Sequence, residues 1–294
     1  MANSYCIHFN KLPAYLTALT DVTITAPLGV FYPFGSAAGD TFFPYPNDGF
    51  INITLLHPFL YFNRTHQDIH VSPYGGLLLG QLLSLNYDVI APFFVRTDYS
   101  ERGNVSYQQY TTGDVLHTAT RDISSYFPNV TFTASWVLVV TWDRVVYYQT
   151  NDTVTNDQKA TFQVILISGG DLSFVLMNYG DISPTPWPMR IGYSYNQTII
   201  LLNDCYPNGT IDAVNLNTSS NINIPGRWAF PTSLESTFSC EQHVVGVHLQ
   251  VSSAERLNET AVEEQILKPL RDLLRQRGVD VSGIRLRRLV EKQP

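Results

Sequence analysis

The chain has 294 residues and a net charge of −7, with 44% hydrophobic and 13% aromatic residues. This composition is typical of an ordered globular protein and not of a disordered one. The acidic balance gives no basic footprint, so we expect no nucleic-acid partner. No run approaches the roughly 18 consecutive apolar residues of a spanning helix, so we expect no membrane span within this chain.

Charge density changes near residue 240. Residues 1–240 carry 9 Lys and Arg against 17 Asp and Glu, whereas residues 241–294 carry 9 against 8. A shift of this kind usually separates two modules.

The first module is expected to be mainly β. Short runs with period-two alternation are separated by turn residues at 22–25, 51–55, 69–72, 87–95, 104–111, 136–142, 161–167, 173–179 and 191–195. Strands at this spacing without long intervening helices predict an antiparallel sandwich or barrel. One short helix is expected after Asp114, taken as its N-cap, since apolar residues then recur at helical spacing: Leu116, Ala119, Ile123 and Tyr126.

The run 136–142 is predicted to be a central strand. Both of its alternating faces are apolar, as in a strand buried on two sides. The predicted structural core consists of Trp136, Leu138, Val140, Trp142, Phe162, Phe174 and Trp228. Asp143 and Arg144 follow where this strand is expected to end, and an ion pair is favoured there over a general acid, because no partner carboxylate or histidine has a suggestive spacing.

The second module is predicted to be a βαβ segment. A strand carries Val245, Val247, Leu249 and Val251, an amphipathic helix carries Val262, Ile266, Leu270, Leu273 and Leu274, and a last strand begins at Ile284 and Leu286. Pro269 should kink the helix. About 50 residues are marginal as an independent domain. We therefore expect a truncated or partnered module.

The sequence contains no familiar catalytic or metal-binding motif. GxSxG, HExxH, GxGxxG and the Walker loop are all missing, so we expect no enzyme and no cofactor. His66 and His70 lie on a predicted strand and are interpreted as surface polar residues, not zinc ligands. The turn aspartates, Asp40, Asp48, Asp98 and Asp152, do not match an EF-hand, and turn formation is favoured over calcium binding.

Nine Asn-x-Ser/Thr sequons occur, where chance would give roughly three. They begin at Asn52, Asn63, Asn104, Asn129, Asn151, Asn196, Asn208, Asn217 and Asn258. The excess favours a glycosylated, exported protein, and the alternative is an accident of a Thr- and Asn-rich composition. The N-terminus has neither the basic region nor the apolar region of a signal peptide, so we expect that a leader is not present in this chain.

The three cysteines are too few for a disulfide scaffold. Cys205 and Cys240 flank the end of the β module, and a bridge between them would close a loop of about 35 residues and stabilise by roughly 3–4 kcal/mol. Cys6 would then be free or pair with another chain. Three free thiols, or partners in modules outside this chain, are the alternatives.

Several aromatic landmarks occur in an order that resembles the NIDO domain, the extracellular module of nidogen, alpha-tectorin and certain membrane mucins, with the alpha-tectorin type as the closest match. The landmarks are 32-YPFG-35, 47-NDG-49, 90-IAPFF-94, 126-YFPNVTFTASWVLVVTWDRVVYY-148, 161-TFQVILISGGDLSFVLMNY-179, 191-IGYSYN-196 and 224-IPGRWAF-230. The resemblance implies a mainly β, antiparallel sandwich-like module with no catalytic residues. It also implies an extracellular place and a role in cell–matrix adhesion, with matrix proteins or other modules of the same protein as partners.

One loop departs from the family pattern. The family usually has APFWADVD where this chain has Ala91 to Asp98, so Phe94 replaces a Trp and Arg96 replaces an Asp. Any site that the family builds at this loop is therefore not carried over.

The expected organisation is an N-terminal segment at 1–27, the NIDO module at 28–232, a linker at 233–243 and the βαβ segment at 244–294. That last segment resembles half of a SEA-type domain. The alternative function is a carbohydrate-binding module that uses exposed aromatics such as Trp187 or Tyr195.

Overall fold

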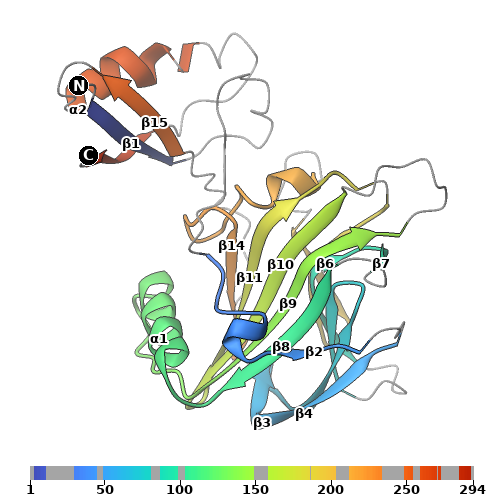
Figure 1. Cartoon of the computed structure of the whole chain (residues 1–294). Helices are drawn as coiled ribbons and strands as arrows, with labels where there is room; N and C mark the ends of the chain where they lie inside the picture. The colour runs from blue at the N-terminus through green and yellow to red at the C-terminus, as the bar shows by residue number, and fades with distance from the viewer. Residues whose placement is uncertain are drawn as a thin grey trace.

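The structure, a computed structural model, describes residues 3–10, 30–44, 49–80, 87–98, 103–148, 158–185, 187–202, 212–233, 248–253, 259–269, 271–272 and 285–292. Within these ranges the chain forms three β-sheets and one long α-helix, α1 (Asp114–Tyr126) (Figure 1). The predicted mainly β fold is confirmed.

Two of the sheets form a sandwich. The seven-stranded sheet has the order β14 (Arg227–Pro231), β11 (Leu172–Ile182), β10 (Lys159–Gly169), β9 (Trp136–Tyr147), β8 (Asn104–Tyr110) and β2 (Thr41–Phe42), with β7 (Thr97–Asp98) also paired to β9. The six-stranded sheet has the order β13 (Thr198–Leu201), β12 (Arg190–Tyr195), β6 (Asp88–Phe94), β5 (Gly76–Leu79), β4 (Arg64–Ser72) and β3 (Ile51–Tyr61). All strand pairs in both sheets are antiparallel.

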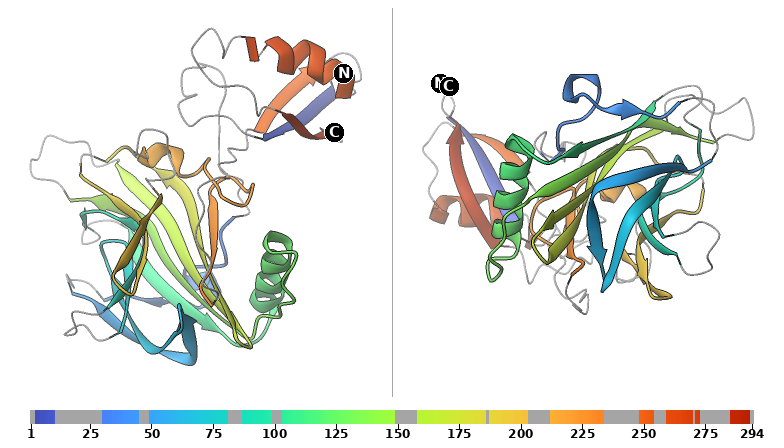
Figure 2. Two further views of the ribbon diagram at one scale, coloured as in Figure 1. Left: turned by 180° about the vertical axis from the view of Figure 1, so that it is seen from behind. Right: turned by 90° about the horizontal axis from the view of Figure 1, so that it is seen from below.

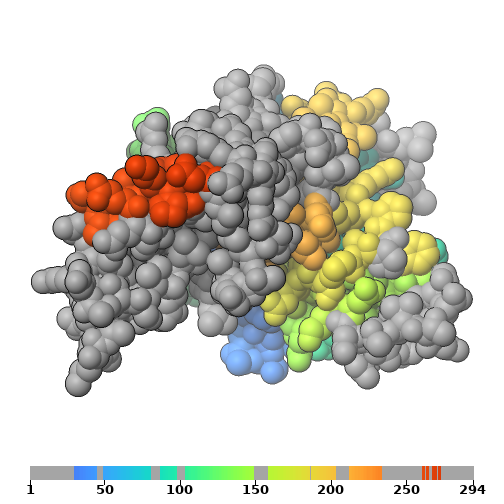
Figure 3. Space-filling view, turned by 90° about the horizontal axis from the view of Figure 1, so that it is seen from above, coloured from blue at the N-terminus to red at the C-terminus, as the bar shows by residue number. Residues whose placement is uncertain are grey.

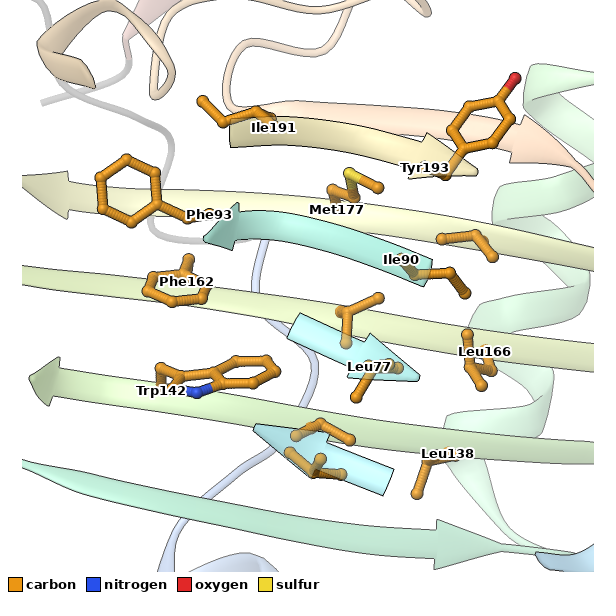
Figure 4. Close-up of a cluster of buried hydrophobic side chains, with 14 of the residues drawn as sticks. Leu77, Ile90, Phe93, Leu138, Trp142, Phe162, Leu166, Met177, Ile191 and Tyr193 are labelled. Atoms are coloured by element: carbon orange, nitrogen blue, oxygen red, sulfur yellow. The ribbon is translucent and has the colours of Figure 1, made fainter. Parts of the chain in front are cut away.

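The main hydrophobic core lies between these two sheets. Figure 4 shows side chains of the six-stranded sheet facing those of the seven-stranded sheet: Leu77, Ile90, Phe93, Ile191 and Tyr193 on one side, and Leu138, Trp142, Phe162, Leu166 and Met177 on the other. The rings of Trp142 and Phe162 stack with centroids 4.9 Å apart. Every residue of the predicted core is at most 1% exposed: Trp136, Leu138, Val140, Trp142, Phe162, Phe174 and Trp228.

A second apolar cluster lies on the other face of the seven-stranded sheet, beneath α1. Val137 and Val139 of β9 lie in this cluster with Leu116, Ala119 and Ile123 of the helix. The prediction that 136–142 is buried on both sides is thus confirmed. The N-cap prediction is wrong, because α1 is capped by Gly113 at φ 91° and Asp114 is its first residue. Asp114 can still interact favourably with the positive end of the helix dipole.

A polar network, here called the Arg227 network, joins four segments under α1. The Arg227 guanidinium is 2.7 Å from the Asp122 carboxylate of α1 and donates to Asn178 Oδ1 of β11 at 2.7 Å, and also to the Val30 carbonyl. Its side chain also lies 5.5 Å over the ring of Tyr32. Burial, and next the Asp122 charge, raise the pKa of Tyr32.

The Arg227 network continues through Gln163 of β10. The Gln163 side chain bonds to both the backbone N–H and the carbonyl of Tyr32, and it donates to Thr141 Oγ1 at 2.9 Å. The landmarks around Tyr32 and Arg227, almost 200 residues apart, therefore meet in one buried cluster.

The Asp143–Arg144 ion pair is confirmed, with N···O at 3.1 Å. Its expected place at the end of a strand is wrong, because β9 continues to Tyr147. Arg144 has φ 52°, and the register of β9 against β10 shifts between Ala160 and Phe162. The pair therefore lies at a bulge within the strand.

The third sheet combines the two ends of the chain. Its order is β15 (His248–Ser253), β1 (Asn3–Asn10) and β16 (Arg285–Lys292), and β1 is antiparallel to both neighbours. No strand is predicted at residues 3–10 from the sequence alone. Since Ser4 pairs with Lys292, the described ends of the chain lie side by side, as Figure 2 also shows. The partner of the C-terminal segment is thus a strand of the same chain.

The helix between β15 and β16 is irregular. It begins with α2 (Glu259–Val262) and continues as a π-helical turn, η4 (Glu263–Leu267), two residues before Pro269. A wide turn relieves the clash of the proline ring with the preceding turn. Glu263 pairs with Arg271 across it, and Figure 3 shows described side chains of this helical segment at the surface. Val245, Val247, Leu270, Leu273, Leu274 and Ile284 lie outside the described residues.

Candidate functional site

A glycine turn fixes the segment 93–97 at the end of β6. Gly75 has φ +89°, and a Cβ atom there would lie 2.1 Å from the Phe93 carbonyl oxygen, so only glycine fits. Across this contact Val95 N–H donates to the Tyr74 carbonyl at 3.0 Å, and Thr97 Oγ1 donates to the Pro73 carbonyl at 2.9 Å. The turn therefore holds the segment that carries Phe94 and Arg96.

Arg96 is exposed beside two aromatic residues, Tyr148 and Trp187, and Phe94 is exposed two residues before it on the same segment. These four residues are here called the Arg96 cluster: Phe94, Arg96, Tyr148 and Trp187. The Arg96 guanidinium lies 4.8 Å over the Tyr148 ring and 5.1 Å over the Trp187 ring. Trp187 Nε1 donates to the Tyr148 carbonyl at 2.6 Å, and Tyr148 N–H donates to the Arg96 carbonyl at 2.9 Å. These two bonds hold the three residues side by side, and the cation–π contacts relate their side chains to one another.

The Arg96 cluster has the chemistry of a contact surface. Tyr148 is 40% and Phe94 37% exposed, so this surface presents aromatic area and a positive charge to a partner. An arginine held by cation–π contacts keeps its donors in a fixed plane that can bind a carboxylate. The family pattern has Trp and Asp where this chain has Phe94 and Arg96, so position 96 carries a cation in place of an anion.

A second charged group lies at the opposite end of β6. The Asp88 side chain is 2% exposed. Its carboxylate forms an ion pair with Arg64 at 3.3 Å and accepts a hydrogen bond from the Asn196 N–H at 2.9 Å. His66 Nε2 lies 3.9 Å from the same carboxylate, and His66 is only 9% exposed. Burial lowers the pKa of His66, although the Asp88 charge opposes this. The interpretation of His66 as a surface residue is therefore wrong, because β4 turns its ring inward.

The other residues considered as metal ligands, His70 and the turn aspartates, make structural contacts where the structure describes them. His70 Nε2 lies 2.9 Å from the Gly80 carbonyl, and Asp40 Oδ2 accepts from the Gly35 N–H at 2.8 Å and from Ser106 Oγ at 2.6 Å. Asp40 thus closes the turn that follows Tyr32. Among the residues that the structure describes, no three His, Cys, Asp or Glu side chains gather as a metal site. Asp48 and Asp152 lie outside the described residues, as does the side chain of Asp98.

The predicted modification sites are spread over the molecule. Asn63 and Asn196 lie at turns, Asn52 in β3, Asn104 at the start of β8, Asn129 after α1 and Asn217 after the short 3-10 helix η3 (Ala213–Asn215). Asn151, Asn208 and Asn258 lie outside the described residues, as do Cys205 and Cys240. Cys6 is in β1, next to Gln250 and Val290 in register.

The two aromatic residues named for a carbohydrate site, Trp187 and Tyr195, have different surroundings. Trp187 belongs to the Arg96 cluster, whereas the Tyr195 ring stacks on Phe62 with centroids 3.8 Å apart. Phe94, Arg96 and Tyr148 were not singled out as contact residues from the sequence. The signal that could have found Phe94 and Arg96 was the departure of this loop from the family pattern.

Comparison with known proteins matches the sequence of this chain to a family. The Nidogen-like domain profile matches residues 60–233. Alpha-tectorin of Mus musculus is 30% identical over 229 residues, which cover 69% of this chain and 10% of the relative. Dendrite extension defective protein 1 of Caenorhabditis elegans is 25% identical over 237 residues, which cover 76% of this chain and 20% of the relative. Nidogen-2 of Mus musculus is 23% identical over 257 residues, which cover 74% of this chain and 18% of the relative.

The chain thus spans only a tenth to a fifth of the length of these relatives. No solved structure matches it. In the described part of the chain, no helix is long and apolar enough to cross a membrane. The family profile covers more than half of the chain and follows the sandwich from the end of β3 to β14, and the chain therefore belongs to the Nidogen-like (NIDO) domain family.

Proposed function

We propose that this chain is a non-catalytic adhesion module of a secreted or cell-surface glycoprotein of the extracellular matrix. Membership of the NIDO family supports an extracellular location, and the nine sequons support export. The partner is a matrix protein or another module of the same full-length protein. In this organisation the NIDO module occupies residues 28–232, and the linker 233–243 leads to the α+β segment at 244–294, which β1 completes.

The Arg96 cluster is the observation that carries a protein–protein role. Trp, Tyr and Arg are the residue types most enriched among binding hot spots, and here one of each lies in mutual contact. The fixed geometry lowers the entropy cost of ordering these side chains on binding. A rigid, partly exposed patch of this composition suits the centre of a protein interface.

The test compares retention on decellularised matrix for the wild-type chain and the Arg96→Ala variant. We expect the dissociation constant to rise about tenfold or more, since hot-spot truncations cost roughly 2 kcal/mol or more. Tyr87→Ala is the matched control, because Tyr87 is 44% exposed at the opposite end of β6. Equal binding of both variants and the wild type would refute a role for the cluster.

The alternative, a carbohydrate-binding module, rests on the same Trp187 and on Tyr195. Treating the matrix with glycosidases separates the two functions. Retention that survives deglycosylation supports protein contact, whereas loss of retention together with binding to a glycan array supports sugar recognition.

A further inference from the structure

Two hairpin turns lie side by side at the Asp88 end of the six-stranded sheet. The β3–β4 turn contains Phe62 and Asn63, at φ 42° and 64°, and the β12–β13 turn contains Asn196 and Gln197, at φ 47° and 66°. Each turn carries a sequon whose asparagine directly follows an aromatic residue, Phe62 or Tyr195. The match between the turns is not visible in the sequence, where they are over 130 residues apart.

Specific contacts hold the two turns together. Arg64 bonds to Asp88 at 3.3 Å and donates to Asn196 Oδ1 at 3.0 Å. The Phe62 and Tyr195 rings stack with centroids 3.8 Å apart and planes 12° from parallel. An N-linked glycan attaches to Nδ2 of asparagine, so the hydrogen bond to Asn196 Oδ1 is kept when the residue is modified.

Exposure also favours these two sequons. Asn63 and Thr65 are both exposed, and so are Asn196 and Thr198. By contrast the hydroxyl residue of the Asn104 sequon, Ser106, is 2% exposed and bonded to Asp40, and that of the Asn217 sequon, Ser219, is 3% exposed.

In the remaining described sequons, at Asn52 and Asn129, the asparagine and the threonine are both exposed. However, Asn52 lies inside a strand, and Asn129 has no second sequon turn described beside it. The pair at the Asp88 end is therefore distinguished by its hairpin tips and its stacked aromatic residues.

We propose that Asn63 and Asn196 both carry N-linked glycans, which emerge side by side over the Phe62–Tyr195 stack. In the reaction Nδ2 forms a bond to the anomeric carbon of a lipid-pyrophosphate-linked oligosaccharide. The sugar–phosphate bond breaks, the lipid pyrophosphate leaves with the electron pair, and Nδ2 gives up one proton. The apolar faces of the first sugars can then pack on the partly buried rings. This proposal rests on export of the chain, which is part of the proposed function.

The placement has a consequence for binding. β6 runs from Asp88 to Phe94, and seven strand residues span roughly 20 Å. Because N-glycans are bulky and hydrated, they would cover the end of the sheet at Asp88. The Arg96 cluster, at the other end of β6, stays free for a partner.

The experiment uses the whole chain, expressed behind a secretory leader and purified from the medium. N-glycans are removed by an amidase in ¹⁸O-labelled water, which converts each occupied asparagine to labelled aspartate, and the tryptic peptides are mapped by mass spectrometry. We expect label at both Asn63 and Asn196. The Asn63→Gln and Asn196→Gln variants should each lose one glycan from the intact mass, and the double variant should lose two.

The outcomes separate this proposal from the proposed function. Label at other sequons with either Asn63 or Asn196 unlabelled overturns the pairing and leaves export intact. No label at any sequon overturns both. Because the map is made on the unmutated chain, a variant that fails to fold does not remove the test.

Discussion

Replacing Arg227 with methionine should destabilise the sandwich strongly. Arg227 is 4% exposed, and its guanidinium contacts α1 through Asp122, β11 through Asn178 and the segment at residue 30 through the Val30 carbonyl. Methionine fills most of the side-chain volume, so little cavity forms. Asp122, whose side chain is 14% exposed, would keep only the weaker pairing with the exposed Arg121, whose Nε lies 3.9 Å from the carboxylate.

The expected loss is about 3 kcal/mol. Removing one partner of a buried ion pair costs roughly 3–5 kcal/mol, and the partial exposure of Asp122 places this pair at the lower end. Urea unfolding measures the change, with a lower midpoint and an unchanged slope.

A double-mutant cycle isolates the charge. Asp122→Asn removes the carboxylate that has lost Arg227, so Arg227→Met combined with Asp122→Asn should lose less stability than the sum of the two single changes. A loss below about 1 kcal/mol for Arg227→Met, or strict additivity in the cycle, would refute the assignment of the network as a clamp between the segments.

Three further predictions concern other parts of the molecule. Trp136→Ala should cost about 3–5 kcal/mol through the cavity that it leaves, and an unchanged urea midpoint would contradict the central place of β9. His66 has a lowered pKa, so the unfolded chain binds its proton more readily, and the stability that it contributes is lost as the pH falls below about 6.5. The urea midpoint of His66→Gln should therefore change less than that of the wild type between pH 7.5 and 5.5, and parallel pH profiles would disprove this. Deleting residues 1–10 removes the middle strand of the third sheet, so amide protection should vanish from β15 and β16 while the sandwich keeps its own. Retained protection would show that these strands do not depend on β1.

Alternation in single strands was enough to predict much of the sandwich. Strands β9, β10 and β11 follow period-two patterns of large apolar residues, and such a pattern sets burial whatever the neighbours are. Short or irregular strands were missed: β5, β13 and β14 have four or five residues, too few for a period to be read. The bulge at Arg144 was misread as a strand end, because a charged pair interrupts the alternation without ending the hydrogen bonding.

The sequence by itself determined the fold class, the two-sided burial of β9 and the family, since each depends on residue types at fixed local spacings. Tertiary structure alone decided which distant residues meet. It joined Tyr32 to Arg227, placed β1 between β15 and β16, and turned His66 toward Asp88. It also brought Arg96 over the rings of Tyr148 and Trp187, and set the turns of Asn63 and Asn196 side by side. Such pairings depend on strand order and register over long separations, which local periodicity does not encode.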